Sequence, residues 1–291
     1  MVDSRHWWSG VQCERIHLRA GTRGVDRIHS GHFFYFGLRG RLILRVENSN
    51  LSVAPGKLAF IPAGQRYSMQ VPAAEPCAYH ILRLKHRAFG LAAEADSEAW
   101  EILMALTRYV RKRPGLLSTG GGSPASVRRL LERMAKETAE QGPGSRPQLK
   151  ALVLELLVLL GRQRWLLREW KDFSHNAPAF LKVKRALLYV DDHYAEPLAV
   201  PDLARVAGLS RSHFHAVFKQ YAGMTVNAYL NRFRIGRACH LLRQTDDTVL
   251  SICYACGFGS PSRFWVAFRR EMGRSPAVFR KGRSGQSDKT R

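Results

Sequence analysis

The chain has 291 residues, of which 46 are Lys or Arg and 23 are Asp or Glu, so its formal net charge is +23. This length allows two domains with separate cores, and the basic excess favours a polyanionic partner. The five cysteines are scattered, which does not suggest a disulfide framework, and the chain starts without the apolar run of a signal peptide. The longest apolar segment, residues 151–160, is too short to span a bilayer. We therefore expect a cytoplasmic protein.

Residues 11–88 alternate short β-rich runs with turn residues. Many short strands at such spacing predict a barrel or a sandwich. A turn is expected at 37–40. The strands are expected at 32–36, 42–46, 51–53, 58–61 and 77–84. The order of these runs, with Pro55-Gly56, Ile61-Pro62 and Gly64 between them, resembles a small cupin-like barrel.

The residues that would hold a metal in a cupin are not present as a set. Metal-dependent cupins use a His-x-His pair, a later carboxylate and a further histidine, whereas His29 and His32 are three residues apart and Tyr67 stands near the position of the later histidine. Cys253 and Cys256 form a C-x2-C pair without a second pair nearby, which favours packing in a helix. We expect no metal and no cofactor, so the barrel is a metal-free ligand pocket or an inert scaffold.

The middle of the chain predicts amphipathic helices at 99–110, 127–139 and 148–170. The glycine-rich segment 115–124 has the composition of a flexible linker, and 171–178 is expected to join two domains. The leucine face of the third helix is wide enough to cover the barrel and still meet a second subunit. A role in the core alone is the alternative.

One stretch of the chain, Ser210–Tyr229, recurs fifty residues later as Ser260–Phe279. Each copy begins with a serine suited to a helix N-cap, has buried positions at helical spacing, and ends its helix at a glycine. A shorter helix precedes each copy, over 201–207 before Gly208 and over 249–256 between its cap Thr248 and Gly257. A short helix, a tight turn and a capped second helix are typical of a helix-turn-helix, so two such motifs are predicted.

Residues 182–281 closely resemble the DNA-binding domain of the AraC/XylS family of transcription regulators. The residues that carry the resemblance include Tyr194–Leu198, Asp202–Ala204, Ala207–Ser210, Phe218–Lys219, Gly257–Phe258, Phe268–Arg269 and Ser275–Pro276. The resemblance implies a regulator whose two recognition helices read adjacent major grooves of double-stranded DNA. Many family members carry a cupin-like barrel in front, dimerise through the helices that follow it, bind a small-molecule effector and contact RNA polymerase.

The same resemblance implies contacts to DNA on both recognition helices. Base contacts are expected near the N-terminal end of each helix, whereas the serine caps and the basic residues at the helix ends face phosphates or only water. Trp265 and Val266 depart from the polar residues usual in the family, and they suit thymine methyl groups or a protein partner. The expected DNA-contact residues are Ser210, Arg211, Ser212, His215, Ala216 and Lys219 in the first motif, and Ser260, Ser262, Arg263, Trp265, Val266 and Arg269 in the second.

By resemblance to sugar-sensing family members, Arg39 and His80 fall at ligand-contacting positions of the barrel. The alternatives are a solvated turn residue for Arg39 and a core histidine for His80. Nothing in residues 182–281 has the spacing of a catalytic nucleophile and base, so we expect no enzyme.

The expected fold is α+β and multidomain, with a cupin-like β-barrel, a helical dimerisation region and a C-terminal all-α domain with two helix-turn-helix motifs. The expected function is sequence-specific transcription regulation, as an activator or a repressor. The alternatives are a cupin-type enzyme and a non-specific architectural DNA-binding protein. The expected boundaries are 1–95 for the barrel, 96–175 for the helical region, 176–283 for the DNA-binding domain and 284–291 for a disordered tail.

Overall fold

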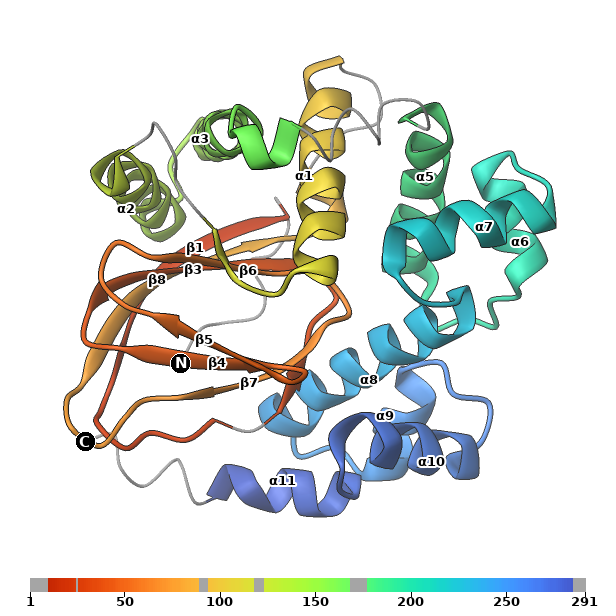
Figure 1. The fold of residues 1–291 in the computed structure, drawn as a ribbon. Helices are drawn as coiled ribbons and strands as arrows, with labels where there is room; N and C mark the ends of the chain where they lie inside the picture. The colour runs from red at the N-terminus through yellow and green to blue at the C-terminus, as the bar shows by residue number, and fades with distance from the viewer. Residues whose placement is uncertain (1–9, 25, 89–93, 118–122, 168–176, 285–291) are drawn as a thin grey trace.

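The computed structural model describes residues 10–24, 26–88, 94–117, 123–167 and 177–284. A β-sheet domain comes first in these ranges, three helices follow, and an all-α domain completes the chain (Figure 1). No helix in these ranges is long and apolar enough to cross a membrane. The expected tail at 284–291 and most of the expected linker at 171–178 lie outside the described residues.

The strands of the first domain form two sheets and not one closed barrel, which corrects the expected shape while leaving a cupin-like sheet domain. One sheet has the order β1-β8-β3-β6-β9 and the other the order β2-β7-β4-β5. The strands are β1 (Val11–Leu18), β2 (Arg27–Ile28), β3 (His32–Arg39), β4 (Leu42–Val46), β5 (Ser49–Val53), β6 (Leu58–Ile61), β7 (Arg66–Gln70), β8 (Cys77–Leu84) and β9 (Leu116–Leu117).

Side chains alternate between the two faces of the five-stranded sheet, as the pleat of a strand requires. Phe33 and Tyr35 of β3 point into the core between the sheets, whereas Phe34 and Phe36 pack on the opposite face. Aromatic and aliphatic side chains fill the space between the sheets. The hydroxyl oxygens of Tyr35 and Tyr67 lie 2.6 Å apart there.

Three helices cover the outer face of the five-stranded sheet. Figure 1 shows α2 and α3 lying over β1, β8 and β3. Trp100 of α1 and Leu130 of α2 belong to the core that joins these helices to the sheet. The three are α1 (Glu94–Lys112), α2 (Pro124–Glu140) and α3 (Ser145–Gly161).

Two predicted segments of irregular chain are partly strands. The turn expected at 37–40 is wrong, because β3 continues to Arg39 with an irregularity at Gly37. A Cβ at Gly37 would lie 2.1 Å from the carbonyl oxygen of Ala54, so only glycine allows this crossing of two backbones. The linker expected at 115–124 contains β9, which pairs with β6 and buries Leu117.

The helix expected at 148–170 is also wrong in its extent, because α3 ends at Gly161 with Arg162 as its C-cap. Gly161 packs tightly on Ile102 of α1, and a Cβ there would lie 2.9 Å from the Ile102 side chain. The polar run that follows interrupts the leucine pattern. The apolar face of α3 is used mainly against α1 and α2.

The all-α domain has two packed halves joined by α8. The first half holds Phe214, Phe218 and Tyr229, and the second half holds Ile235, Leu242 and Phe268. Its helices are α5 (Ala177–His193), α6 (Val200–Ala207), α7 (Arg211–Ala222), α8 (Val226–Gln244), α9 (Val249–Ala255), α10 (Pro261–Met272) and α11 (Pro276–Ser284).

Candidate nucleic-acid interface

The first helix-turn-helix consists of α6 and α7. Gly208 ends α6 in the left-handed conformation, with φ 62°, where glycine carries no steric penalty. Ser210 then caps α7, because its hydroxyl accepts a hydrogen bond from the backbone N–H of His213 at 3.3 Å. Phe214 and Phe218 are fully buried in the domain core. The predicted second helix is therefore present with the predicted face inside.

The second helix-turn-helix, formed by α9 and α10, repeats this construction. Thr248 caps α9 through the N–H of Ser251, and Ser260 caps α10 through the N–H of Arg263. Gly257 sits in the turn with φ 80°, and a Cβ there would lie 2.4 Å from the carbonyl oxygen of Tyr194. Only glycine allows this turn to pack against the end of α5.

The residues predicted to contact DNA lie on the outward faces of α7 and α10. On α7, His215 is half-buried and its predicted neighbours are exposed. On α10, Val266 is 69% exposed and Trp265 is 39% exposed, so two adjacent large apolar side chains face solvent there. The exposed predicted residues are Ser210, Arg211, Ser212, Ala216, Lys219, Ser262, Arg263, Trp265, Val266 and Arg269, while Ser260 is half-buried at its cap.

Helix α8 determines the distance between the two motifs. Its 19 residues give a length of roughly 28 Å at 1.5 Å per residue. Its first half packs into the core of the first motif and its second half into the core of the second. Successive exposures of the major groove on one face of DNA lie about 34 Å apart. The rigid helix α8 thus holds the two recognition helices at a separation comparable to one turn of DNA.

Sequence reasoning missed polar residues of α8 beside the second recognition helix. Asn227 and Asn231 line a hollow of about 550 Å³ together with Ser262, Arg263 and Val266 of α10. The hollow is open at the surface where α10 begins. Helical periodicity places Asn227 and Asn231 on one face, four residues apart, and this was the available signal.

Buried Arg234 of α8 was also missed. Its guanidinium group donates hydrogen bonds to the carbonyl oxygens of Tyr194 at 2.8 Å and Glu196 at 2.7 Å. These contacts attach the loop between α5 and α6 to α8, so Arg234 positions the first motif.

The two residues expected to contact a ligand are not equivalent in the structure. Arg39 is exposed at the end of β3. His80 is only 2% exposed, and it shares the helix-covered face of the sheet with Leu82, whereas Tyr79 and Ile81 point into the core between the sheets. Burial lowers the pKa of His80. A contact between His80 and a ligand would therefore have to occur beneath α2.

Both cysteines of the C-x2-C pair are buried as predicted, but only Cys253 lies within α9, and Cys256 is the C-cap of that helix. Cys253 and Cys256 lie in the core of the second motif with no exposed surface, and burial raises the pKa of Cys256 to about 12. Among the described residues no group of three His, Cys, Asp or Glu side chains is arranged to hold a metal ion.

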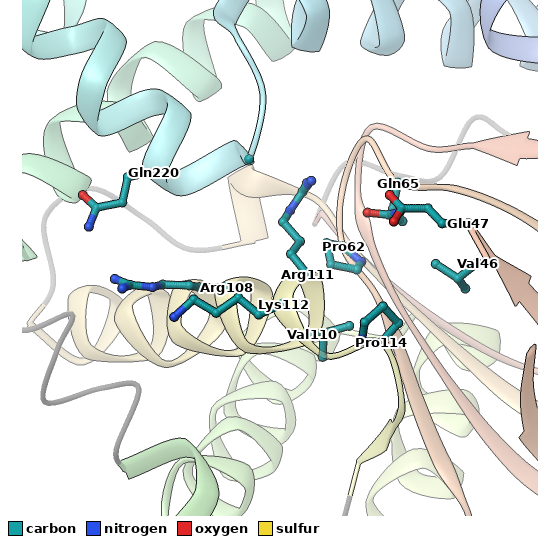
Figure 2. Close-up of a pocket in the computed structure, with 11 residues that line it drawn as sticks. Val46, Glu47, Pro62, Gln65, Arg108, Val110, Arg111, Lys112, Pro114 and Gln220 are labelled. Carbon is teal, nitrogen blue, oxygen red and sulfur yellow. The ribbon is translucent and has the colours of Figure 1, made fainter. Parts of the chain in front are cut away.

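The sheet domain contacts the first motif through Arg111 of α1. Figure 2 shows Arg111 extending from α1 past Pro62 towards the end of α7, in a hollow of about 420 Å³. Its guanidinium group donates a hydrogen bond to the carbonyl oxygen of Ala63 at 2.8 Å, and its Cδ lies close to Gly223, the C-cap of α7. Burial lowers the pKa of Arg111. The first recognition helix therefore ends against the sheet domain.

Two capped recognition helices on one rigid connector define a helix-turn-helix protein, here with a β-sandwich domain in front. A family model described as an AraC-like ligand binding domain matches residues 13–157, and one described as a helix-turn-helix domain matches residues 203–282. The chain belongs to the AraC family.

Among curated proteins, the chain is similar to the HTH-type transcriptional activator RhaS. It is 34% identical to RhaS of Escherichia fergusonii over 157 residues, which cover 54% of each chain. It is 33% identical to RhaS of Salmonella heidelberg over 187 residues, which cover 63% of this chain and 58% of that protein. The matched stretch thus spans a little more than half the length of these relatives.

Among solved structures, the fold is similar to that of ToxT from Vibrio cholerae O395. The TM-score is 0.57 at 13% identity, and the match covers 95% of this chain and 99% of ToxT. A structure of ToxT from strain SCE256 with a bound unsaturated fatty acid has a TM-score of 0.58 at 13% identity, over 96% of this chain and 98% of that one. The order of the two domains is therefore shared along almost the whole length.

Proposed function

We propose that this chain is a sequence-specific DNA-binding transcription regulator, acting as an activator, whose two recognition helices read adjacent major grooves. The observation that carries the proposal is the pair α7 and α10, each capped by serine, each outward-facing and both fixed to α8. An architectural protein that binds phosphates alone does not need two such helices. The relatives named above are activators, which favours a regulator over an enzyme.

Different residues of the two recognition helices contact bases and phosphates. Ser212, His215 and Ala216 contact bases in the first groove, and Ser262 and Arg263 contact bases in the second, because they lie near the N-terminal ends that enter the groove. The backbone N–H groups at the Ser210 and Ser260 caps, with Arg211, Lys219 and Arg269, contact phosphates. Trp265 and Val266 contact thymine methyl groups, which suits apolar side chains that are exposed in the absence of DNA.

The experiment that tests this function is selection of bound duplexes from a random pool by the full chain at near-physiological salt. Two enriched blocks about one helical turn apart are expected, because one subunit carries two readers. A single block would show that α10 does not read bases and would make Trp265 and Val266 a protein-docking surface. Equal binding to all duplexes with a steep salt dependence would favour the architectural alternative.

The first 175 residues provide effector binding and dimerisation. The sheet domain binds a small-molecule effector, the helical region makes a homodimer, and the regulator contacts RNA polymerase in the cytoplasm, as the resemblance implies. Arg39 and His80 remain the effector contacts predicted from sequence. Val158 of α3 is 40% exposed and leaves an apolar spot for a second subunit. Sedimentation of the full chain tests this, and a monomer at high concentration would contradict it.

A further inference from the structure

The last turn of each recognition helix holds one buried polar side chain at the same position of the duplicated unit. The repeat that aligns Ser210 with Ser260 also aligns Tyr221 of α7 with Glu271 of α10. Tyr221 is 4% exposed and Glu271 is 6% exposed. Buried polar groups are costly unless they have partners, so the partners of these two residues show what each helix end packs against.

Tyr221 contacts the sheet domain directly. Its hydroxyl oxygen lies 3.4 Å from Nε2 of His86, which begins the 3-10 helix His86–Ala88 after β8. Burial raises the pKa of Tyr221, so the phenol keeps its proton and can donate it to this nitrogen. The Tyr221 ring also stacks on that of Trp100 in α1, with centroids 6.2 Å apart. The C-terminal end of α7 is thus held by two residues that precede the all-α domain.

His86 also contacts α5. Its Nδ1 lies 3.7 Å from Oδ2 of Asp191, and both side chains are almost completely buried. One tautomer satisfies both neighbours: with the proton on Nδ1, the N–H faces Asp191 and Nε2 can accept from Tyr221. The Trp100 ring meets the His86 ring edge-on, at 5.8 Å between centroids. His86 therefore joins the sheet domain to α5 and α7, which lie beside α1 (Figure 1).

The second recognition helix is attached at the equivalent position through different residues. Glu271 pairs with Arg232 of α8, and Arg232 donates a hydrogen bond to the carbonyl oxygen of Gly64 at 3.3 Å. The sheet domain thus reaches α7 through His86 and α10 through Arg232. The outward faces of both helices remain exposed with the sheet domain in place, so neither attachment covers the residues proposed to contact bases.

The attachment of α7 lies at the opposite end of the helix from its base contacts. Tyr221 comes nine residues after Ser212, which is roughly 14 Å along a helix. A tilt of about 10° around the attached end would move Ser212 by roughly 2 Å, which is enough to break a hydrogen bond. A small change at His86 is therefore enlarged into a displacement at the bases of the first groove.

We propose that His86 is a positioning residue for DNA reading, because it holds α7, through Tyr221, in the orientation in which the first motif reads its groove. Arg232 has the same role for α10 and the second groove. The inference rests on the proposed function and extends it, since it makes the sheet domain part of the DNA-reading structure, with a separate attachment for each motif. Loosening one attachment should weaken the reading of one half of the DNA site.

The test measures the affinity of full-chain variants for the duplex selected by the wild type and for single-base variants of its two blocks. Tyr221→Phe removes only the hydroxyl, and His86→Leu removes both ring nitrogens at similar size. His86→Gln is the conservative variant, because an amide can still accept from Tyr221 and donate to Asp191. Arg232→Met loosens the other attachment. Tyr254→Phe is the matched control, since Tyr254 is 53% exposed on α9.

His86→Leu and Tyr221→Phe should lower the affinity for the selected duplex by roughly three- to tenfold and reduce base discrimination in the first block alone. Arg232→Met should reduce discrimination in the second block alone, which Arg263→Ala identifies by removing a base contact of α10. His86→Gln should retain most of the wild-type discrimination. Tyr254→Phe should leave both blocks unchanged.

Amide hydrogen exchange in the absence of DNA measures the attachment itself. The N–H of Gly223 donates to the carbonyl oxygen of Lys219, and the N–H of Gly273 donates to that of Arg269, each at 2.8 Å. Exchange at Gly223 should become roughly threefold faster or more in His86→Leu and in Tyr221→Phe, while exchange at Gly273 stays unchanged. Arg232→Met should have the opposite pattern.

Three results on DNA would overturn the proposal: equal losses in both blocks, unchanged discrimination in the first block for both His86→Leu and Tyr221→Phe, or a His86→Gln variant that behaves like His86→Leu. Unchanged exchange at Gly223 in both variants would also overturn it. If the wild type selects no duplex, the proposed function fails, and the exchange measurement still decides whether His86 holds α7. The two failures are therefore distinguishable.

Discussion

The carbonyl oxygen of Ile28 in β2 lies against Gly236 in the middle of α8, so closely that a Cβ on Gly236 would be only 2.9 Å from it. Glycine in a helix interior is destabilising by itself, and here it allows the sheet domain to approach the helix backbone directly. The contact lies between the two helix-turn-helix motifs. It joins the sheet domain to α8 at one point.

Gly236→Ala should change the free energy of unfolding in opposite directions in residues 176–291 alone and in the full chain. In residues 176–291 alone it should stabilise α8 by about 0.5–1 kcal/mol, because alanine is the better helix former. In the full chain it should destabilise, because the methyl group pushes on backbone and not on a flexible side chain. Urea unfolding of both forms measures this. If the free energy of unfolding changed in the same direction in both, the sheet domain would not pack against α8 in this way.

His215→Ala and Arg263→Ala should each relax base preference at one position of the selected site and cost about 1–3 kcal/mol on the preferred duplex. Lys219→Ala is the matched control, because a phosphate contact weakens all duplexes to a similar degree and reduces the salt dependence by about one counter-ion. Affinity measured on the preferred duplex and on single-base variants separates these cases. A uniform loss for His215→Ala would make that residue a phosphate contact.

Glu271 is 6% exposed and pairs with Arg232 and Arg270, each at 2.9 Å. Arg232 also donates a hydrogen bond to the carbonyl oxygen of Gly64 in the sheet domain at 3.3 Å. Glu271→Gln should therefore lower the free energy of unfolding by about 1–3 kcal/mol, because it leaves two cations without their carboxylate. Glu132→Gln, at an exposed pair in α2, should change it by less than about 0.5 kcal/mol. Chemical denaturation compares the two, and equal effects would contradict the prediction.

The stability of the protein should fall as the pH falls below about 6.5. Burial lowers the pKa of His29 and of His32 well below the ordinary value, so the unfolded chain binds protons in this range and the folded chain does not. The stabilising effect is complete above the unfolded pKa. As the pH falls further, the free energy of unfolding decreases by up to about 1.4 kcal/mol per histidine and per pH unit.

His32→Gln is the variant that checks this pH dependence. It removes one of the buried titrating histidines, while an amide can still accept the hydrogen bond that His32 Nδ1 accepts from the N–H of Ala63. Urea unfolding at pH 7.5, 6.5 and 5.5 should show a smaller slope than in the wild type. An unchanged slope would mean that His32 is accessible to protons in the folded state.

Local signals account for what could be predicted of the DNA-binding half. The serine caps, the turn glycines and the 3.6-residue spacing of Phe214 and Phe218 act within one or two helical turns, and the predicted helices were found there. A domain of short β-strands was predicted from the sequence, but its division into two sheets was not. The alternation of side chains along β8 does not by itself show which face of the strand packs against the other sheet. The position of His80 beneath the helices could therefore be determined only from the tertiary structure.

The sequence by itself determined that this chain carries two capped recognition helices, because caps, turns and apolar spacing are properties of neighbouring residues. Only the tertiary structure decided that the strands form two open sheets, that α3 ends at Gly161 and that His86 contacts Tyr221. These features depend on contacts between segments far apart in the chain, where the alternatives differ in packing and not in local conformation.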